Sequence, residues 1–242
     1  MRSLLAATSF LTRLPAGRLI TFDAADVARS AGWFPLIGAT LGAVIGLSGA
    51  LLRGHLPAAV IAALLVLIDV ALTGALHWDG LADSADGFGG GKDRDDVLRI
   101  MRDHSIGSYG GVALAVFVAL KFACYEALLD GGNWITAAIA TPMLGRWAIL
   151  LLSATLPYAR QSASIVDHVG KGSLLWATLI TAAILLAIRS DRAWIGAGVV
   201  ALVTLAFGLY CRHRIGGITG DTLGANVALS ESAALLVFLW TA

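Results

Sequence analysis

Seven apolar runs, each about as long as a membrane-spanning helix, constrain this chain more than any other feature. A helix needs about 20 mostly apolar residues to cross the hydrocarbon core of a bilayer. Because a bilayer offers no water to the backbone, continuous apolar runs of this length fold as helices. We therefore expect an all-α, polytopic integral membrane helical bundle with about seven transmembrane helices, over residues 31–52, 58–77, 109–129, 134–153, 173–189, 193–211 and 225–241.

The composition agrees with a membrane protein and argues against several other classes. Of the 242 residues, 58% are hydrophobic and 14% are charged, and the mean hydropathy is +0.82, whereas a soluble domain carries more charge. A net charge of +1 without a basic patch interleaved with aromatics gives no sign of a nucleic-acid partner. Cys124 and Cys211 lie in or beside apolar runs, away from any Cys/His cluster, so we expect buried thiols and no zinc site.

The domain organisation is predicted to be simple. The sequence shows no repeat of fixed period and no linker, so residues 1–242 are expected to form a single membrane domain. Residues 1–14 are apolar but too short to span the bilayer, and they lack the cleavage site of a signal peptide, which predicts an interfacial helix. The sequence leaves open whether the chain forms a homo-oligomer.

The polar segments between the runs predict the orientation. With seven spans, residues 1–30, 78–107, 154–172 and 212–225 lie on one side of the bilayer. Twelve of the 17 lysines and arginines fall on that side, three on the other, and two within spans. The positive-inside rule then makes these acidic, polar loops cytoplasmic. We expect a protein of the cell inner (cytoplasmic) membrane with its active site facing the cytoplasm.

Three aspartates directly after the second run are the strongest local signal. Asp79, Asp83 and Asp86 are spaced at i, i+4 and i+7, which places them within an arc of roughly 60° on a helix. Their charges repel unless a cation lies between them, and Mg²⁺, which takes oxygen ligands and bridges to phosphates, is the expected one. The alternative is a solvated acidic face beside the membrane. His77 is either a substrate contact or a structural histidine, and the glycine-rich stretch 87–91 is expected to break the helix.

A fourth carboxylate, Asp103, lies further along beside Arg99 and Arg102. A carboxylate next to two guanidinium groups suits a phosphate, with a metal on one side and an arginine on the other. The alternative for the two arginines is an anchor to anionic lipid headgroups.

Polar residues in or beside other spans are further candidates. The glycine-rich stretch 216–225, which contains Asp221, enters the last span, and such a helix start exposes N–H groups to an anion. Arg146, Asn226 and Glu231 lie within spans, where polar residues are usually functional. Glu231 could equally be a structural partner for Arg146.

Five motifs follow one another along nearly the whole chain: FLTRLP at 10–15, WFPLIG at 33–38, TGALHWDGLADSADG at 73–87, RIMRD at 99–103 with Ile106 and Gly107, and GGITGDTLGA at 216–225. With these motifs the chain resembles the cobalamin (cobamide) synthase family, whose members are adenosylcobinamide-GDP ribazoletransferases. The third and fifth motifs are highly specific. Small departures occur at Trp78, where a smaller apolar residue is common, and at Tyr109, and neither touches a proposed ligand.

The resemblance implies a specific reaction in the last steps of vitamin B12 biosynthesis. The enzyme would join adenosylcobinamide-GDP to α-ribazole or its 5′-phosphate, with Mg²⁺ as cofactor. A ribazole hydroxyl would attack the phosphorus attached to the cobinamide arm. The products would be adenosylcobalamin, or its 5′-phosphate, and GMP.

For that reaction we expect Asp79, Asp83 and Asp86 to hold Mg²⁺ against the pyrophosphate. Asp103 or Asp221 would complete the metal shell or take the hydroxyl proton. The remaining expected site residues are Arg99, Arg102 and Arg146 for the charge on the leaving GMP, His77 and Asn226 for catalysis or substrate contact, and Gly80 and Gly220 for close approach of the substrate.

Two other classes of function remain open. Another Mg-dependent membrane transferase, CDP-alcohol phosphotransferase-like or prenyltransferase-like, would have an arginine shortly after Asp79–Gly80 or a second aspartate-rich motif, and neither is present. A corrinoid transporter without catalysis would more often show polar residues spread through the midplane and an internal repeat. Here the polar residues collect at one face, which favours an enzyme.

Overall fold

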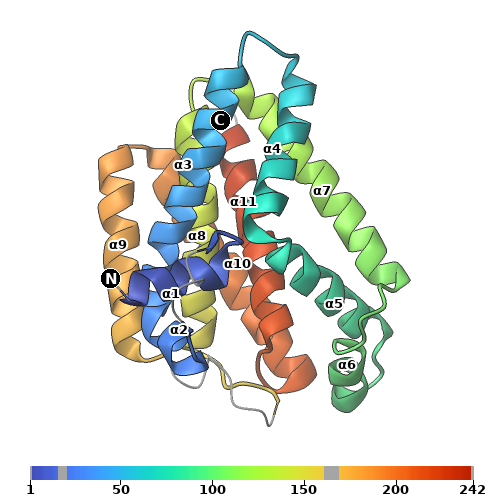
Figure 1. Cartoon of the computed structure of the whole chain (residues 1–242). Coiled ribbons are helices and arrows are strands. Elements are labelled where there is room, and N and C mark those ends of the chain that lie inside the picture. The colour runs from blue at the N-terminus through green and yellow to red at the C-terminus, as the bar shows by residue number, and fades with distance from the viewer. Residues whose placement is uncertain (1, 16–20, 161–168, 241–242) are drawn as a thin grey trace.

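The structure is a computed structural model that describes residues 2–15, 21–160 and 169–240, and every regular element in these ranges is a helix (Figure 1). The elements are α1 (Arg2–Leu11), α2 (Ala24–Ser30), the 3-10 helix η2 (Ala31–Trp33), α3 (Phe34–Leu52), α4 (Ala58–Thr73), α5 (Leu76–Gly90), α6 (Arg94–Ile100), α7 (Ser108–Leu129), α8 (Trp134–Ser153), α9 (Lys171–Ile188), α10 (Asp191–Ile215) and α11 (Gly220–Leu239).

The expected number of spans agrees with this arrangement. Within the described ranges, six helical segments are long and apolar enough to cross a membrane, and the bent pair α4–α5 can supply a seventh. The long helices run side by side in Figure 1, with the short helix α6 at one end of the bundle. The predicted all-α, multi-pass membrane bundle is confirmed. Part of the predicted polar segment 154–172 lies outside the described residues, because 161–168 are not among them.

Close backbone packing of α3 on α8 explains the glycines of the first span. A Cβ atom on Gly38 would collide with the carbonyl oxygen of Pro142, and one on Gly42 would collide with that of Ala138. The sequence repeats glycine every four residues along this face of α3, which predicts a smooth helix surface for close packing. The structure confirms that prediction.

The second predicted span, residues 58–77, is wrong at its end. Helix α4 stops at Thr73, and α5 starts at Leu76 after a bend of 90°. Gly74 and Ala75 both adopt left-handed backbone angles, with φ of +64° and +59°. Glycine takes this conformation readily, whereas alanine does so at a cost, so the sequence signals only half of the break.

Helix α5 is also longer than expected, because the stretch 87–91 does not end it early. The helix runs through Gly90 and is capped by Gly91. These glycines instead make room for α6: a Cβ atom on Gly87 would collide with the Met101 side chain, and one on Gly91 would lie 2.7 Å from the Val97 Cα. The polar segment between the second and third spans therefore folds back on itself as two helices.

Candidate active site

A pocket of about 380 Å³ lies between α1, α2, η2, α3, α5, α8 and α11. Most of its lining is apolar and includes Phe10, Phe34, Ile149 and Leu223. The structure brings five of the predicted site residues together on its wall, namely His77, Asp79, Gly80, Gly220 and Asp221. An apolar chamber with a few convergent polar groups is the usual form of a small-molecule site.

The crossing of α5 over α11 places Asp79 and Asp221 on the same pocket wall. A Cβ atom on Gly80 would lie 2.6 Å from the carbonyl oxygen of Asp221, and one on Gly224 would lie 3.2 Å from the Gly80 Cα. The two helices therefore meet backbone to backbone at this point. We predicted that Gly80 leaves room for a substrate, but the space beside it is filled by α11. A Cβ atom on Gly220 would meet no atom within 4 Å, so that room stays open.

Asp221 lies in the first turn of α11, where the polar segment before α11 meets the polar segment after α8. Thr219 and Thr222 form a capping box that fixes the start of the helix. The segment before α11 pairs with the segment after α8, through bonds from the Ile218 N–H to Pro157 and from the Ala159 N–H to Ile218. This pairing brings Arg160 to Asp221, with 2.6 Å between Nη2 and Oδ2.

Asp83 is half-buried one turn after Asp79 and lies in a field of like charge. The charges of Asp79, Asp221 and Asp86 all act on its carboxylate, and Arg160 is the opposing cation that acts on it. Carboxylates gathered in this way repel each other and favour an added cation.

Asp86, the third residue of the predicted metal stripe, turns to a different partner. Its carboxylate accepts hydrogen bonds from the backbone N–H groups of Gly107 and Gly110, at 2.7 and 2.8 Å. A Cβ atom on either glycine would collide with that carboxylate. Asp86 therefore fixes the start of α7 against α5, and the structure does not bring the three aspartates together as one ligand set.

Asp103 lies away from the pocket, on the exposed turn between α6 and α7. It accepts a hydrogen bond from the backbone N–H of Ser105 at 3.0 Å, and this bond lowers the pKa of its carboxyl below the usual range. Of the two carboxylates expected to complete the metal shell or to take the hydroxyl proton, the structure thus brings Asp221 to the pocket but not Asp103.

A second pocket, of about 410 Å³, is lined mainly by arginines. We call it the arginine pocket, and its lining comprises Arg94, Arg99, Arg102 and Arg160 together with Asp95, Leu98 and Ala159. Arg99 pairs with Asp96, and their hydrogen bond lowers the pKa of the Asp96 carboxyl. The predicted phosphate-contacting residues Arg99 and Arg102 therefore lie together, but in the arginine pocket rather than in the apolar one.

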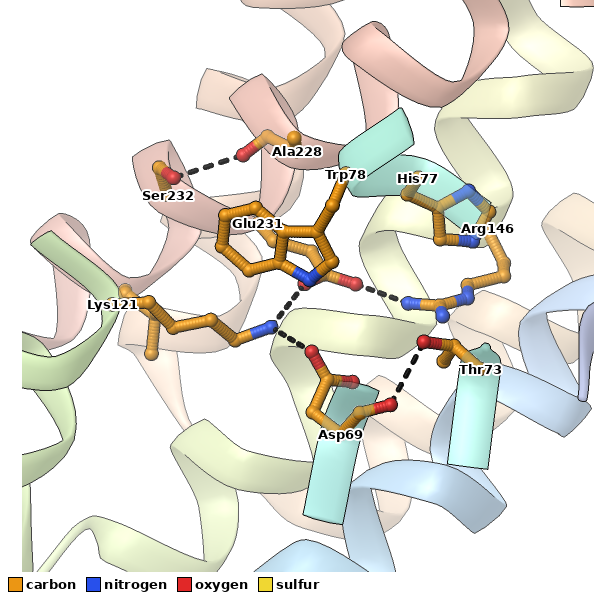
Figure 2. Close-up of a pocket in the computed structure, with 10 residues that line it drawn as sticks. Asp69, Thr73, His77, Trp78, Lys121, Arg146, Ala228, Glu231 and Ser232 are labelled. Atoms are coloured by element: carbon orange, nitrogen blue, oxygen red, sulfur yellow. Dashed lines mark hydrogen bonds and ion pairs between the residues drawn. The ribbon is translucent and has the colours of Figure 1, made fainter. Parts of the chain in front are cut away.

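Arg146 lies inside the bundle, in a buried network of four charges (Figure 2). Lys121 Nζ lies 2.6 Å from Asp69 Oδ2 and 2.8 Å from Glu231 Oε2, and Arg146 pairs with Glu231. A direct contact of Arg146 with the leaving nucleotide does not fit this position, whereas the alternative pairing with Glu231 is observed. The four charged side chains line a small cavity inside the bundle. His77 lines both this cavity and the apolar pocket, and therefore lies between them.

Asn226 is fully buried in the interior. Its Nδ2 donates to the Ala148 carbonyl at 3.2 Å and to Thr204 Oγ1 at 3.3 Å. These bonds join α11 to α8 and α10, so the structure does not bring Asn226 to the substrate pocket.

Comparison with known proteins gives the chain a family. The profile of the cobalamin-5-phosphate synthase family matches residues 3–239, nearly the whole chain. The chain belongs to the cobalamin-5-phosphate synthase family. No solved structure matches it.

Relatives from several bacteria carry the name adenosylcobinamide-GDP ribazoletransferase. The one from Pseudomonas aeruginosa is 39% identical over 98% of this chain and 97% of its own. The one from Syntrophobacter fumaroxidans is 36% identical over 90% of each chain, and that from Clostridium botulinum (strain Okra / Type B1) is 33% identical over 99% and 98%. The names of these family members place the chain among the transferases of the cobalamin pathway.

The carboxylates of this cobalamin-5-phosphate synthase family member fit a Mg²⁺ ion that is shared with a substrate. In the described parts of the chain, no three Asp, Glu, His or Cys side chains are grouped so as to hold a metal by themselves. Asp79 and Asp83 on α5, with Asp221 across from them, offer oxygen ligands. Mg²⁺ commonly binds one or two carboxylates and completes its shell with water and substrate phosphates.

Sequence reasoning missed some residues that shape the site of this family member. Tyr158 lines the apolar pocket and Arg160 pairs with Asp221, yet the sequence predicts only that both lie in a polar segment. Arg160 and Asp221 are 61 residues apart, and the local sequence around either gives no sign of the other. Phe10 belongs to a recognised motif, but its place on the pocket wall depends on how α1 packs.

Proposed function

We propose that this chain is a Mg-dependent phosphotransferase that joins adenosylcobinamide-GDP to α-ribazole, or to its 5′-phosphate. The products are adenosylcobalamin, or its 5′-phosphate, and GMP. The observation that carries the proposal is the apolar pocket with Asp79 and Asp221 on its wall, in a chain that matches the family over residues 3–239.

In this reaction the apolar part of the pocket takes the aromatic base of α-ribazole. The ribazole hydroxyl then lies at the carboxylate wall and attacks the phosphorus attached to the cobinamide arm. The bond from that phosphorus to the oxygen of the leaving GMP breaks. Asp221 takes the hydroxyl proton, because it lines the pocket whereas Asp103 does not.

Asp79 and Asp83 are the residues that would hold Mg²⁺, because they lie on successive turns of α5 and neither carboxylate is bound to a helix start as Asp86 is. The ion would neutralise charge on the pyrophosphate oxygens during transfer. Asp221 would lie across from them on α11, held in place by Arg160.

The same proposal covers the location of the enzyme. The distribution of Lys and Arg supports a place in the cell inner membrane, with the pocket and the arginine pocket open to the cytoplasm. Helix α1, which contributes Phe10 to the pocket, would lie at the membrane interface.

The test is an assay on purified protein held in liposomes, with adenosylcobinamide-GDP, α-ribazole 5′-phosphate and Mg²⁺. We expect GMP and a cobalamin product to form, and EDTA to abolish both. Asp83→Asn should lower the rate by at least about 100-fold, since loss of a single group that stabilises charge in the transition state costs that much.

Asp191→Asn is the matched control, because Asp191 is exposed at the start of α10 and is not among the pocket residues. Its rate should stay near that of the wild type. A folded protein that still makes product in EDTA would show that the reaction does not require a metal ion. A folded protein that makes no cobalamin product would favour another Mg-dependent membrane transferase or a corrinoid transporter.

A further inference from the structure

We propose that the arginine pocket binds the 5′-phosphate of the acceptor nucleotide, and so selects α-ribazole 5′-phosphate over free α-ribazole. This inference rests on the proposed function and deepens it. It assigns Arg99 and Arg102 to the acceptor rather than to the leaving GMP.

The arginine pocket is built on a fixed frame. Arg94 donates from Nε to the Ile215 carbonyl at 3.0 Å and from Nη2 to the Ala159 carbonyl at 2.7 Å, and so ties α6 to α10 and to the segment after α8. Behind it, Val97 of α6 and Met101, the residue directly after α6, are buried. Arg99 and Arg102 are exposed beyond this frame, and among the described residues Arg102 has no carboxylate within 4 Å.

Arg160 connects the arginine pocket to the candidate active site. It lines the arginine pocket, while its guanidinium pairs with Asp221, which lines the apolar pocket. The Arg160 side chain is only 13% exposed, and its Nε is buried and has no hydrogen-bond partner in the described structure. The ion pair therefore marks the junction of the two pockets, and Arg160 has a donor to spare.

The order of these groups matches an acceptor nucleotide with an apolar base. The apolar chamber fits the base, the carboxylates lie where the ribose hydroxyl reacts, and the arginines lie beyond them, where the 5′-phosphate extends. A phosphate monoester carries nearly two negative charges at neutral pH. Guanidinium groups bind such an anion through paired, charge-assisted hydrogen bonds. The donor fits less well here, because its phosphates must lie at the reacting centre and its guanine base is polar.

The experiment compares the two acceptors in one enzyme. We expect Arg102→Gln to raise the KM for α-ribazole 5′-phosphate by about tenfold or more. The double variant, which combines Arg99→Gln with Arg102→Gln, should raise this KM further. The KM for free α-ribazole and the kcat with either acceptor should stay within about twofold. Binding of α-ribazole 5′-phosphate to the purified protein without donor should weaken by the same factor, which gives a readout independent of turnover.

Arg212→Gln is the matched control. It removes the same charge, but Arg212 is exposed at the end of α10 and lines neither of the two pockets. It should leave the ratio of the two acceptors unchanged. An equal loss with both acceptors would assign the arginines to the donor and overturn the inference. A loss that appears only in vesicles of anionic lipid would assign them to lipid headgroups. A wild-type protein inactive with both acceptors would instead contradict the proposed function.

Discussion

Asp86 is a predicted metal ligand whose contacts give it a structural role. Its two oxygens accept hydrogen bonds from the backbone N–H groups of Gly107 and Gly110, at the start of α7. The spacing of Asp79, Asp83 and Asp86 correctly places all three on one helix, because helical periodicity is local. The partner of Asp86 is more than 20 residues away, and no local pattern around the aspartate predicts it.

This role makes a prediction about stability. Asp86→Ala should lower the free energy of unfolding by about 1–3 kcal/mol, because the part-buried N–H of Gly107 and the buried N–H of Gly110 lose their acceptor. Thermal unfolding of the purified protein in detergent would measure the change. Asp191→Ala, at an exposed position of α10, should change it by less than about 0.5 kcal/mol. Similar losses for both variants would contradict the capping role.

At the scale of helices, glycines decide how closely the elements approach. Those of α3 repeat at helical spacing, so close packing on a neighbouring helix could be predicted from the sequence, but not that the neighbour is α8. The bend between α4 and α5 could not, because Ala75 adopts a left-handed conformation that its residue type does not indicate. That bend turns α5 across α11 and creates the contact of Gly80 with Asp221. The sequence therefore predicts several residues that line one pocket, such as Asp79 and Asp221, but not the helix geometry that brings them together.

The packing of α3 on α8 can be tested with two alanine substitutions. Gly42→Ala should destabilise the protein by about 1–3 kcal/mol, because its Cβ would collide with backbone that cannot move away easily. Gly198→Ala, in α10, meets no atom within 4 Å and should be neutral or stabilising by up to about 1 kcal/mol. Chemical denaturation in mixed micelles would compare them. Equal behaviour of the two variants would mean that α3 and α8 do not touch as closely as described.

At the scale of the whole molecule, the buried charges join four spans behind the candidate active site. Asp69 belongs to α4, Lys121 to α7, Arg146 to α8 and Glu231 to α11 (Figure 2). His77 and Trp78 of α5 line the same cavity. Two positive and two negative groups balance each other, which is what allows them to remain charged inside the bundle. The bent helix with the aspartates therefore rests against a network that fixes its surroundings.

The network predicts that removing one charge is worse than removing a pair. Lys121→Met alone leaves Asp69 buried without a cation, and should cost about 3–5 kcal/mol of unfolding free energy. Lys121→Met combined with Asp69→Leu leaves the pair of Arg146 and Glu231 intact, and should recover most of that loss. Lys121→Met, Asp69→Leu and the double variant form a thermodynamic cycle with the wild type, measured by unfolding in detergent. If the loss of unfolding free energy in the double variant equals the sum of the losses in the two single variants, the charges act independently. The charged residues would then not form a coupled network beside α5.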